Sequence, residues 1–382
     1  MRRAGRAYIE SASHLAIAGE FVDRIYLDHA ATTPVIAPAR EAIARGLAAW
    51  ANPSSPHREG RAARALLEEA RTTIATALDW RHDVIFTSGA SESIEIVAAR
   101  CPLARRAYLA TEHSIVPHAM GEGAAILSVD RNGLIDETAL DALLTEGPAL
   151  IAIQLVNNET GVIQPLDRLG PRIREAGSLL LADCAQSAGK LPLPQADFVA
   201  ACGHKLGGPP GIGVLLVRDL AHIAAVGGQE MGYRRGTQAV PDALGFAAAL
   251  AAKPYDLDRL ASLRRRLEDG VRASGGEIIA ADAPRIPTIG AVALPGASNA
   301  ALLIQFDLAG IAVSAGSACS SGKMQASAVM AAMAIPADLA ASFLRVSFGP
   351  DTAEAEIDAF LTEWWRIAAR AEAARAQASA AA

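Results

Sequence analysis

The fold class follows from a short apolar run, Phe198-Val199-Ala200-Ala201, and from the triplet Gly203-His204-Lys205 that comes just behind it. The run is too brief for a core helix, so it predicts a buried strand. Three further runs of this kind are Val84–Phe86, Leu150–Val156 and Leu179–Ala182. From Asp83 to about Val217 such runs alternate with helix-like amphipathic stretches, which predicts an α/β fold of repeated β-α units around a mostly parallel sheet.

Polar residues follow each of the four runs, at the point where the strand should end. They read Thr87-Ser88-Gly89-Ala90-Ser91, Asn157-Asn158-Glu159-Thr160-Gly161, Asp183-Cys184-Ala185-Gln186 and Gly203-His204-Lys205. In an open parallel sheet, ligands bind outside the carboxyl ends of the strands. Loops are polar in any protein, but four endings with such specific chemistry predict one shared crevice and a site within it.

Composition and charge exclude several classes of protein. The 382 residues are 51% hydrophobic and 20% charged, which suits a sizeable core and excludes disorder as the main state. A net charge of −6, without a basic run interleaved with aromatics, argues against nucleic acid as a direct partner. No apolar stretch approaches the ~18 residues that cross a bilayer. Glu10 and Glu20 interrupt the N-terminal segment where a signal peptide would be apolar, so we expect no membrane association and a cytoplasmic protein.

A domain boundary is expected where Pro254 and Asp256 interrupt an alanine-rich stretch, ahead of a helix over Leu257–Ala273. Residues 1–24 are then an N-terminal extension, and residues 25–254 a large domain whose first residues can pack with the small one. Residues 255–382 form a small α+β domain. Its expected elements are strands at Thr288–Leu294, Ile311–Val313 and Arg345–Phe348 and helices from near Ser298 and Thr352.

Lys205 stands out because the chain has only four lysines and uses arginine for most of its positive charge. At the end of a buried strand, burial favours the neutral amine that a nucleophile needs. A Schiff-base lysine is one interpretation, and a surface lysine in a glycine-rich turn is the other. The glycines at 207–213 do not form a phosphate loop, since the terminal Gly-Lys-Ser/Thr is missing.

Asp183 is expected at a strand end inside the crevice, where an unpaired carboxylate is costly unless it faces a cation. A protonated pyridine nitrogen would serve, and the ring would then act as an electron sink, as pyridoxal phosphate chemistry requires. The alternative is an N-cap aspartate. Gln186 could donate to the ring's hydroxyl oxygen, or it could be an ordinary polar loop residue.

The segment Gly89-Ala90-Ser91-Glu92-Ser93 joins a strand to a helix, and the N–H groups that begin a helix favour an anion such as phosphate. Ser91 or Ser93 could equally be a plain cap. His113 follows the strand-like Ala107–Ala110, so its imidazole could stack on a flat ring or move protons. A structural histidine is the alternative, and no paired Cys/His spacing indicates a metal site.

The four cysteines, Cys101, Cys184, Cys202 and Cys319, form no C-x-x-C pair, so neither a disulfide framework nor a zinc site is indicated. Cys319 lies among glycine, serine and alanine, which predicts an exposed thiol, and nearby Lys323 favours the nucleophilic thiolate. An incidental linker cysteine is the alternative. Arg345 could clamp a substrate carboxylate or form a surface ion pair.

Together these stretches resemble the class V aminotransferases, pyridoxal phosphate enzymes of fold type I, and among them the cysteine desulfurases. The resemblance runs in order from about Ile25 to the helix after Phe348. It is carried by Tyr26–Thr33, Asn52–Ser55, Thr87–Ser93, Thr111–His113, Val156–Gly161, Asp183–Lys190, Gly203–Gly213, Gly227–Glu230, Arg234–Thr237 and Gly316–Ser321.

The resemblance implies pyridoxal 5′-phosphate as cofactor, a large domain with a mostly parallel sheet, and a small α+β domain that carries the cysteine loop. Cofactor contacts would come from Lys205 as the covalent lysine, His113 stacked on the ring, Asp183 at its nitrogen, Gln186 at its phenolic oxygen, and Ala90, Ser91 and His204 around the phosphate. Thr237 would reach the phosphate from the other subunit of a homodimer. Asn158 and Arg345 would hold the substrate carboxylate, and Cys319 would attack the substrate sulfur.

The implied activity converts L-cysteine to L-alanine and passes the sulfur, as a persulfide on Cys319, to an acceptor protein of iron–sulfur cluster assembly or tRNA thiolation. The sequence departs from the family at Cys202, where a phosphate-binding serine is usual, at Ser91 and Ala326, and in its long N-terminal segment. Three alternatives stay open. They are a selenocysteine lyase, another class V aminotransferase, and a non-catalytic partner subunit with the same fold.

Overall fold

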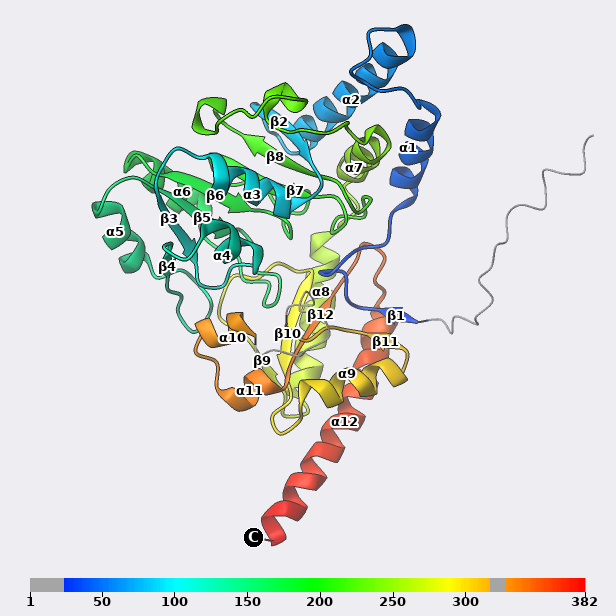
Figure 1. The fold of residues 1–382 in the computed structure, drawn as a ribbon. Helices are drawn as coiled ribbons and strands as arrows, with labels where there is room; N and C mark the ends of the chain where they lie inside the picture. Colours follow the sequence, from blue (N-terminus) through cyan, green and yellow to red (C-terminus); the bar gives the residue numbers. More distant parts are fainter. Residues whose placement is uncertain (1–23, 317–326, 382) are drawn as a thin grey trace, which may run out of the picture.

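The computed structural model describes residues 24–316 and 327–381. Its largest feature is a seven-stranded sheet in the order β2-β8-β7-β6-β5-β3-β4, seen in the upper half of Figure 1. The strands are β2 (Asp83–Thr87), β3 (Arg105–Leu109), β4 (Ala125–Leu127), β5 (Ala149–Gln154), β6 (Leu179–Asp183), β7 (Phe198–Cys202) and β8 (Gly213–Val217). β8 runs opposite to the other six strands and pairs antiparallel with both of its neighbours, β2 and β7. The expected α/β fold with a mostly parallel sheet is confirmed.

The connection from β7 to β8 differs from the repeated β-α pattern. Residues 203–212 link the two strands directly, without a helical crossover, and the strands pair antiparallel with Cys202 opposite Gly213. Adjacent antiparallel strands can be joined by a loop, whereas parallel ones need a long crossover. The glycines and prolines of this loop prevent a helix here, and the loop is the segment that carries Lys205.

Helices cover both faces of the large sheet because consecutive strand residues point to opposite sides. Leu180 and Ala182 pack on one face with α2 (Arg58–Ala77), α5 (Glu137–Thr145), α6 (Leu166–Glu175) and α7 (Val240–Ala252). Leu179 and Leu181 pack on the other with α3 (Ala90–Arg100) and α4 (Ile115–Met120). Helix α1 (Ala37–Ala48) lies against α7. Strands buried on both faces read as continuous apolar runs, which is why the sequence located them.

The rest of the chain forms a smaller unit with its own core. An antiparallel sheet, β12-β10-β9, comprises β12 (Phe343–Ser347), β10 (Ile289–Ala293) and β9 (Glu277–Ile278). Its helices are α8 (Leu257–Arg272), α9 (Asn299–Leu308), α10 (Ala328–Ala332), α11 (Ala337–Ala341) and α12 (Glu354–Ala381). The rings of Phe306 and Phe360 stack with centroids 4.6 Å apart beside the buried Trp364.

The start of the described chain joins this smaller unit. Strand β1 (Ile25–Tyr26) pairs in parallel with β11 (Ile311–Ala312), and Figure 1 shows both at the lower right, away from the large sheet. The division of the chain at residue 254 stays a prediction. Across the described ranges, no helix has both the length and the apolar character of a membrane span.

Candidate active site

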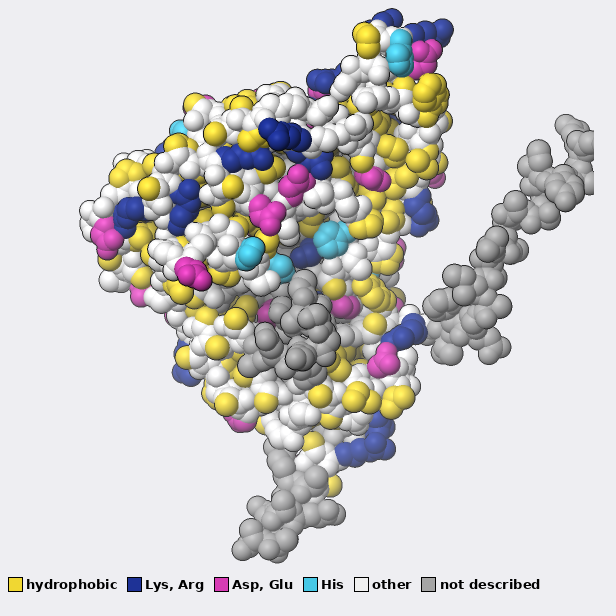
Figure 2. Space-filling view, viewed as in Figure 1, with side chains coloured by type: hydrophobic (Ala, Val, Ile, Leu, Met, Phe, Trp, Pro, Cys, Tyr) yellow, Lys and Arg dark blue, Asp and Glu magenta, His cyan; other side chains and the backbone are white. Residues whose placement is uncertain are grey.

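A cavity of about 460 Å³ lies at the carboxyl ends of β2, β5, β6 and β7. Each of the four polar strand endings contributes to its wall, through Gly89, Asn158, Asp183 and Lys205 among others. Figure 2 shows histidine side chains gathered in the middle of this face, between the large sheet and the smaller unit. The predicted convergence of the four endings on one crevice is therefore what the structure shows.

Most residues that the sequence predicted for the site meet in this cavity. Its wall includes Ala90, Ser91, His113, Asn158, Asp183, Gln186, His204, Lys205 and Arg345. Thr237 lies apart from them, at a hollow of about 50 Å³ that shares only Gly211 with the main cavity. Cys319 lies outside the described residues. Sequence reasoning did not place Ala30, Ala31 and Gln154 in the wall, although the first two belong to the Tyr26–Thr33 motif.

The backbone at Lys205 is held by hydroxyl groups from two distant segments. Thr33 Oγ1 and Tyr255 Oη each donate to the Lys205 carbonyl, at 3.4 and 3.3 Å, and the Thr33 N–H donates to the His204 carbonyl at 2.8 Å. Tyr255 stays a donor because burial raises its pKa to about 12. The backbone of Lys205 is thus held in place, and the half-buried residue lines the cavity.

A second lysine lies behind this loop. Lys190 Nζ sits 4.7 Å from the centre of the Tyr255 ring, a cation–π distance. Burial, and then the positive charge of Lys205, lower the pKa of Lys190 to about 7. Two of the chain's four lysines therefore occupy one neighbourhood, where their charges oppose each other.

Asp183 ends β6 with its carboxylate at the cavity. Its Oδ1 accepts the Ala185 N–H at 2.8 Å, and the next element is β7, so the alternative of a helix N-cap is wrong. Behind it lies Glu112, whose pKa is raised well above its ordinary value by burial and by the charge of Asp183. Burial and the neighbouring Asp183 therefore both disfavour ionisation of Glu112.

Two neutral imidazoles face the cavity. Burial, and then Lys205, lower the pKa of His113, and its Nδ1 accepts the Ile115 N–H at 3.4 Å. The proton of the neutral ring therefore lies on Nε2. Burial, Lys205 and Lys190 lower the pKa of His204 to about 4. The neutral His113 ring keeps an Nε2–H that it can donate, and His204 can likewise donate one ring N–H to an anion.

The start of α3 forms an anion cradle. Gly89, its N-cap, offers no capping side chain, so the first N–H groups of the helix point outward for a ligand. Ser93 is buried and pairs with Thr87 Oγ1 at 2.9 Å and with the Gly89 carbonyl at 3.2 Å. Ser93 therefore stabilises the turn, whereas Ser91, together with Ser88, lies at the cavity wall.

Arg345, on strand β12 of the smaller unit, contributes a positive charge to the cavity wall. It is 2% exposed, so a surface ion pair is excluded. Its Nη2 lies 2.7 Å from Asp28 Oδ1, and its Nη1 donates to the Asn158 carbonyl at 2.9 Å. Its buried Nε has no partner among the described residues. The guanidinium is oriented by two fixed acceptors and keeps donor capacity for a carboxylate.

The cavity residues fit pyridoxal phosphate. Gln186 Nε2 donates to the Ala30 carbonyl at 2.8 Å, while its buried Oε1 has no partner within the described chain. Such an orphan atom requires a ligand or a water. The cradle at α3 suits a phosphate, Asp183 suits a ring nitrogen, and the volume lies in the range of small-molecule sites.

Asp183 and Lys205 leave neighbouring strands of one sheet, β6 and β7, and face the same cavity. Pyridoxal phosphate enzymes of fold type I place their lysine and their ring-pairing carboxylate in this way, and the chain falls within that class. A family model described as "Aminotransferase class-V" matches residues 25–360. The chain belongs to the class V aminotransferase family, and its cofactor is pyridoxal 5′-phosphate.

The individual proteins that are similar to this chain include cysteine desulfurases. An "IscS-like cysteine desulfurase" from Mycobacterium tuberculosis is 36% identical, over 93% of this chain and 99% of the relative. "Cysteine desulfurase IscS" from Vibrio campbellii is 34% identical, over 90% of this chain and 92% of the relative. The X-ray structure of a NifS-like protein from Rickettsia africae is 28% identical and superposes with a TM-score of 0.82, covering 90% of this chain and 99% of that one.

Proposed function

We propose that this chain is a cysteine desulfurase, which converts L-cysteine to L-alanine and transfers the sulfur through a persulfide on Cys319. The similarity to cysteine desulfurases over most of the chain supports this activity. The observation that carries the proposal is the common cavity of Lys205, Asp183, His113 and Arg345. An amine, a carboxylate, a neutral base and a carboxylate-binding cation are the groups that cleavage of an amino acid side chain needs.

The cofactor, when bound, supplies an electron sink for a substrate carbanion. Lys205 would hold it covalently, and the Lys205 amine, when free, would accept the Cα proton of the substrate. The Asp183 carboxylate would pair with the ring nitrogen, and His204, Ala90 and Ser91 would hold the phosphate. Arg345 and the Asn158 side chain bind the substrate carboxylate, which places the reacting carbon beside Lys205.

Cys319 is proposed to act as the nucleophile toward sulfur. Its thiolate attacks the substrate sulfur, so that an S–S bond forms as the carbon–sulfur bond breaks and the electron pair stays with the substrate carbon. Protonation of that carbon, with return of a proton to Cα from Lys205, would yield alanine, and the His113 ring would exchange protons with the thiols.

Both described flanks of the cysteine segment contact segments that line the cavity, which supports this role. On one flank, the Arg345 N–H donates to the Ser314 carbonyl at 2.7 Å. On the other, Ser327 Oγ donates to Glu159 Oε2 at 2.6 Å. Glu159 belongs to the polar segment after β5 that also supplies Asn158 to the cavity. The segment that carries Cys319 therefore starts and ends beside the proposed site.

Mass spectrometry of Cys319 tests this proposal directly. Wild-type holoenzyme incubated with L-cysteine should gain one sulfur atom on Cys319 and release alanine without an added keto acid. Cys319→Ser should keep the cofactor absorbance and form no persulfide, while Cys101→Ser, a change at a buried cysteine outside the cavity, should behave as wild type. Sustained sulfide release by Cys319→Ser would overturn the role. Alanine formation only with a keto acid would favour an aminotransferase.

The cellular context is also part of the proposal. We propose that an acceptor protein of iron–sulfur cluster assembly or tRNA thiolation receives the sulfur in the cytoplasm, and that the enzyme is a homodimer. Thr237 supports the dimer, because it is exposed and lies outside the cavity of its own chain. Sedimentation of the holoenzyme and transfer of ³⁵S from L-cysteine to candidate acceptors test these two points.

A further inference from the structure

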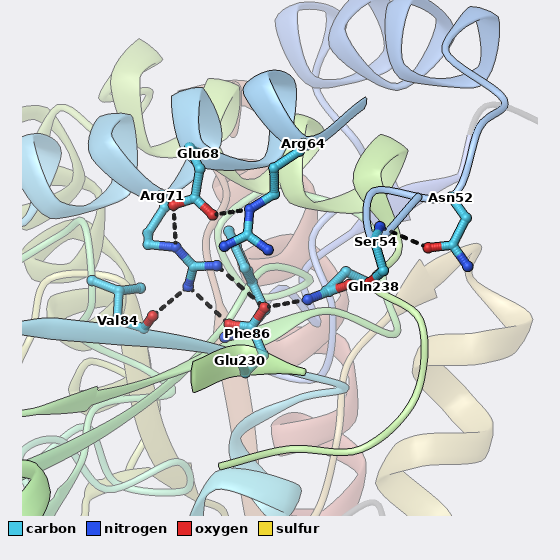
Figure 3. Close-up of polar contacts among 9 residues, drawn as sticks. All are labelled: Asn52, Ser54, Arg64, Glu68, Arg71, Val84, Phe86, Glu230 and Gln238. Carbon is cyan, nitrogen blue, oxygen red and sulfur yellow. Dashed lines mark hydrogen bonds and ion pairs between the residues drawn. The ribbon is translucent and has the colours of Figure 1, made fainter. Parts of the chain in front are cut away.

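A buried carboxylate outside the cavity lies at the centre of a dense polar network, drawn in Figure 3. The side chain of Glu230 is fully buried. Its Oε2 accepts from Arg71 Nη1 and from the Phe86 N–H, both at 2.8 Å. Its Oε1 accepts from Gln238 Nε2 at 2.9 Å and from Arg71 Nη2 at 3.2 Å. The carboxylate is thereby paired and hydrogen-bonded on both oxygens, which a buried charge requires.

Arg71 extends the network to two further elements. It projects from α2, pairs with Glu68 at 2.9 Å, donates to the Val84 carbonyl and lies 4.7 Å over the Phe86 ring. Hydrogen bonds and charge from Arg71 outweigh burial and keep the pKa of Glu230 below its ordinary value. The network therefore joins α2 and β2 to the segment 228–238 through an ionised pair.

The same segment has a second attachment close to the cavity. Arg234 Nε forms an ion pair with Glu92 Oε1 at 2.9 Å, and Glu92 accepts the Ser88 N–H through its other oxygen. Ser88 opens the turn between β2 and α3 that forms the anion cradle. One attachment thus reaches β2 at Phe86, two residues before Ser88, and the other reaches the first turn of α3.

The backbone at the network is held in an unfavourable conformation. Glu230 and Met231 have φ values of 49° and 55°, a left-handed region that side chains other than glycine rarely adopt. Such strain persists only where the surroundings over-determine it, and it is common at ligand clamps. A buried ion pair is also weak evidence for added stability, since apolar replacements are often as stable. Fixing the geometry of the segment is the interpretation that accounts for both features.

We propose that Glu230 is a positioning residue for the cofactor phosphate, which fixes the segment 228–238 against β2 and thereby shapes the cradle at residues 88–91. The inference rests on the proposed function. Glu230 also restrains the position of Thr237, because it accepts a hydrogen bond from the adjacent Gln238. We expect Thr237 to bind phosphate across a dimer. Glu230 does not line the cavity, so its effect passes through the backbone of β2 and through Arg234.

A comparison of pyridoxal phosphate with pyridoxal, which lacks the phosphate, tests this role. Each is released from, and rebound to, the purified enzyme, and the dissociation constant is read from absorbance. Glu230→Gln keeps the side-chain size but loses the charge, and we expect it to weaken pyridoxal phosphate binding at least about tenfold while pyridoxal binding changes little. A purely structural role would weaken both compounds alike.

Glu268→Gln is the matched control, because Glu268 is another buried glutamate paired with an arginine, Arg285, at 2.9 Å. We expect it to lower stability without changing the ratio of the two dissociation constants. If Glu230→Gln does not fold, Gln238→Leu, which removes one donor to Glu230 Oε1, replaces it with the same expected selectivity. An unchanged ratio in the folded variant overturns the inference, whereas a wild-type enzyme that binds neither compound overturns the proposed function itself.

Discussion

Replacing Gly213 with alanine should displace the turn at residues 88–91, the anion cradle, because Gly213 lies against Gly89 of that turn. Gly213 is the first residue of β8 and pairs with Thr87 of β2 and Cys202 of β7. A Cβ at this position would lie 2.5 Å from the Ala201 carbonyl oxygen on β7, 2.6 Å from Gly89 Cα and 2.7 Å from the Gly89 carbonyl carbon. Carbon atoms in ordinary contact are about 3.5 to 4.0 Å apart, so the turn at Gly89 and the β7 backbone at Ala201 must separate from residue 213 by about 1 Å.

The expected cost has two parts. Overpacking of this kind lowers the free energy of unfolding by about 1 to 3 kcal/mol. A shift of about 1 Å in groups that position a substrate can reduce a rate about a hundredfold, and we expect a loss of pyridoxal phosphate affinity of at least about tenfold. Urea unfolding of the cofactor-free protein and absorbance titration with pyridoxal phosphate measure the two parts separately.

Gly123 provides the control. A Cβ there meets nothing within 4 Å, and its backbone is not in the left-handed region. Gly123→Ala should therefore leave affinity unchanged and stability unchanged or slightly higher. The packing argument fails if Gly213→Ala binds the cofactor as tightly as wild type and unfolds at the same urea concentration.

Two further predictions concern protonation. Burial, and then Lys190, lower the pKa of His29 to about 4, so the stability that its neutral form provides is complete above pH 6.5 and is lost as the pH falls toward 4. Between pH 7 and 4, wild type should lose up to about 3 kcal/mol more unfolding free energy than His29→Gln, and equal losses in urea titrations would contradict this. Burial also raises the pKa values of the buried Cys101, Cys184 and Cys202, so in a Cys319→Ser background iodoacetamide should label the unfolded protein much faster than the folded one, as mass spectrometry would show.

The sequence predicts the strands well because buried strands of a parallel sheet are uninterrupted apolar runs. The run expected at Leu179–Ala182 is β6, Leu179–Asp183, and the helix expected over Leu257–Ala273 is α8, Leu257–Arg272. The shared edge of the strands then brings Asp183 and Lys205 together. Local pattern and one topological rule are sufficient for this part of the site.

Long-range pairings are the part that the sequence pattern does not contain. Arg345 meets Asp28 across 317 positions, and Glu230 meets Arg71 across 159. No periodicity links such residues, so the sequence could present Arg345 only as a clamp or a surface ion pair, and Glu230 only as part of a motif. The reversed strand β8 was missed for a related reason, because strand direction depends on which neighbour a strand pairs with.

The Asp28–Arg345 pair has a consequence for biosynthesis. Asp28 leaves the ribosome 317 residues before Arg345, and strand β1 waits for most of that interval until its partner β11 is made. Domains form as the chain emerges from its N-terminus, so the large sheet can assemble first. The side of the cavity that holds Arg345 can form only after residue 345 has been synthesised. A nascent chain released before that residue would therefore offer pyridoxal phosphate an incomplete cavity that is open to solvent.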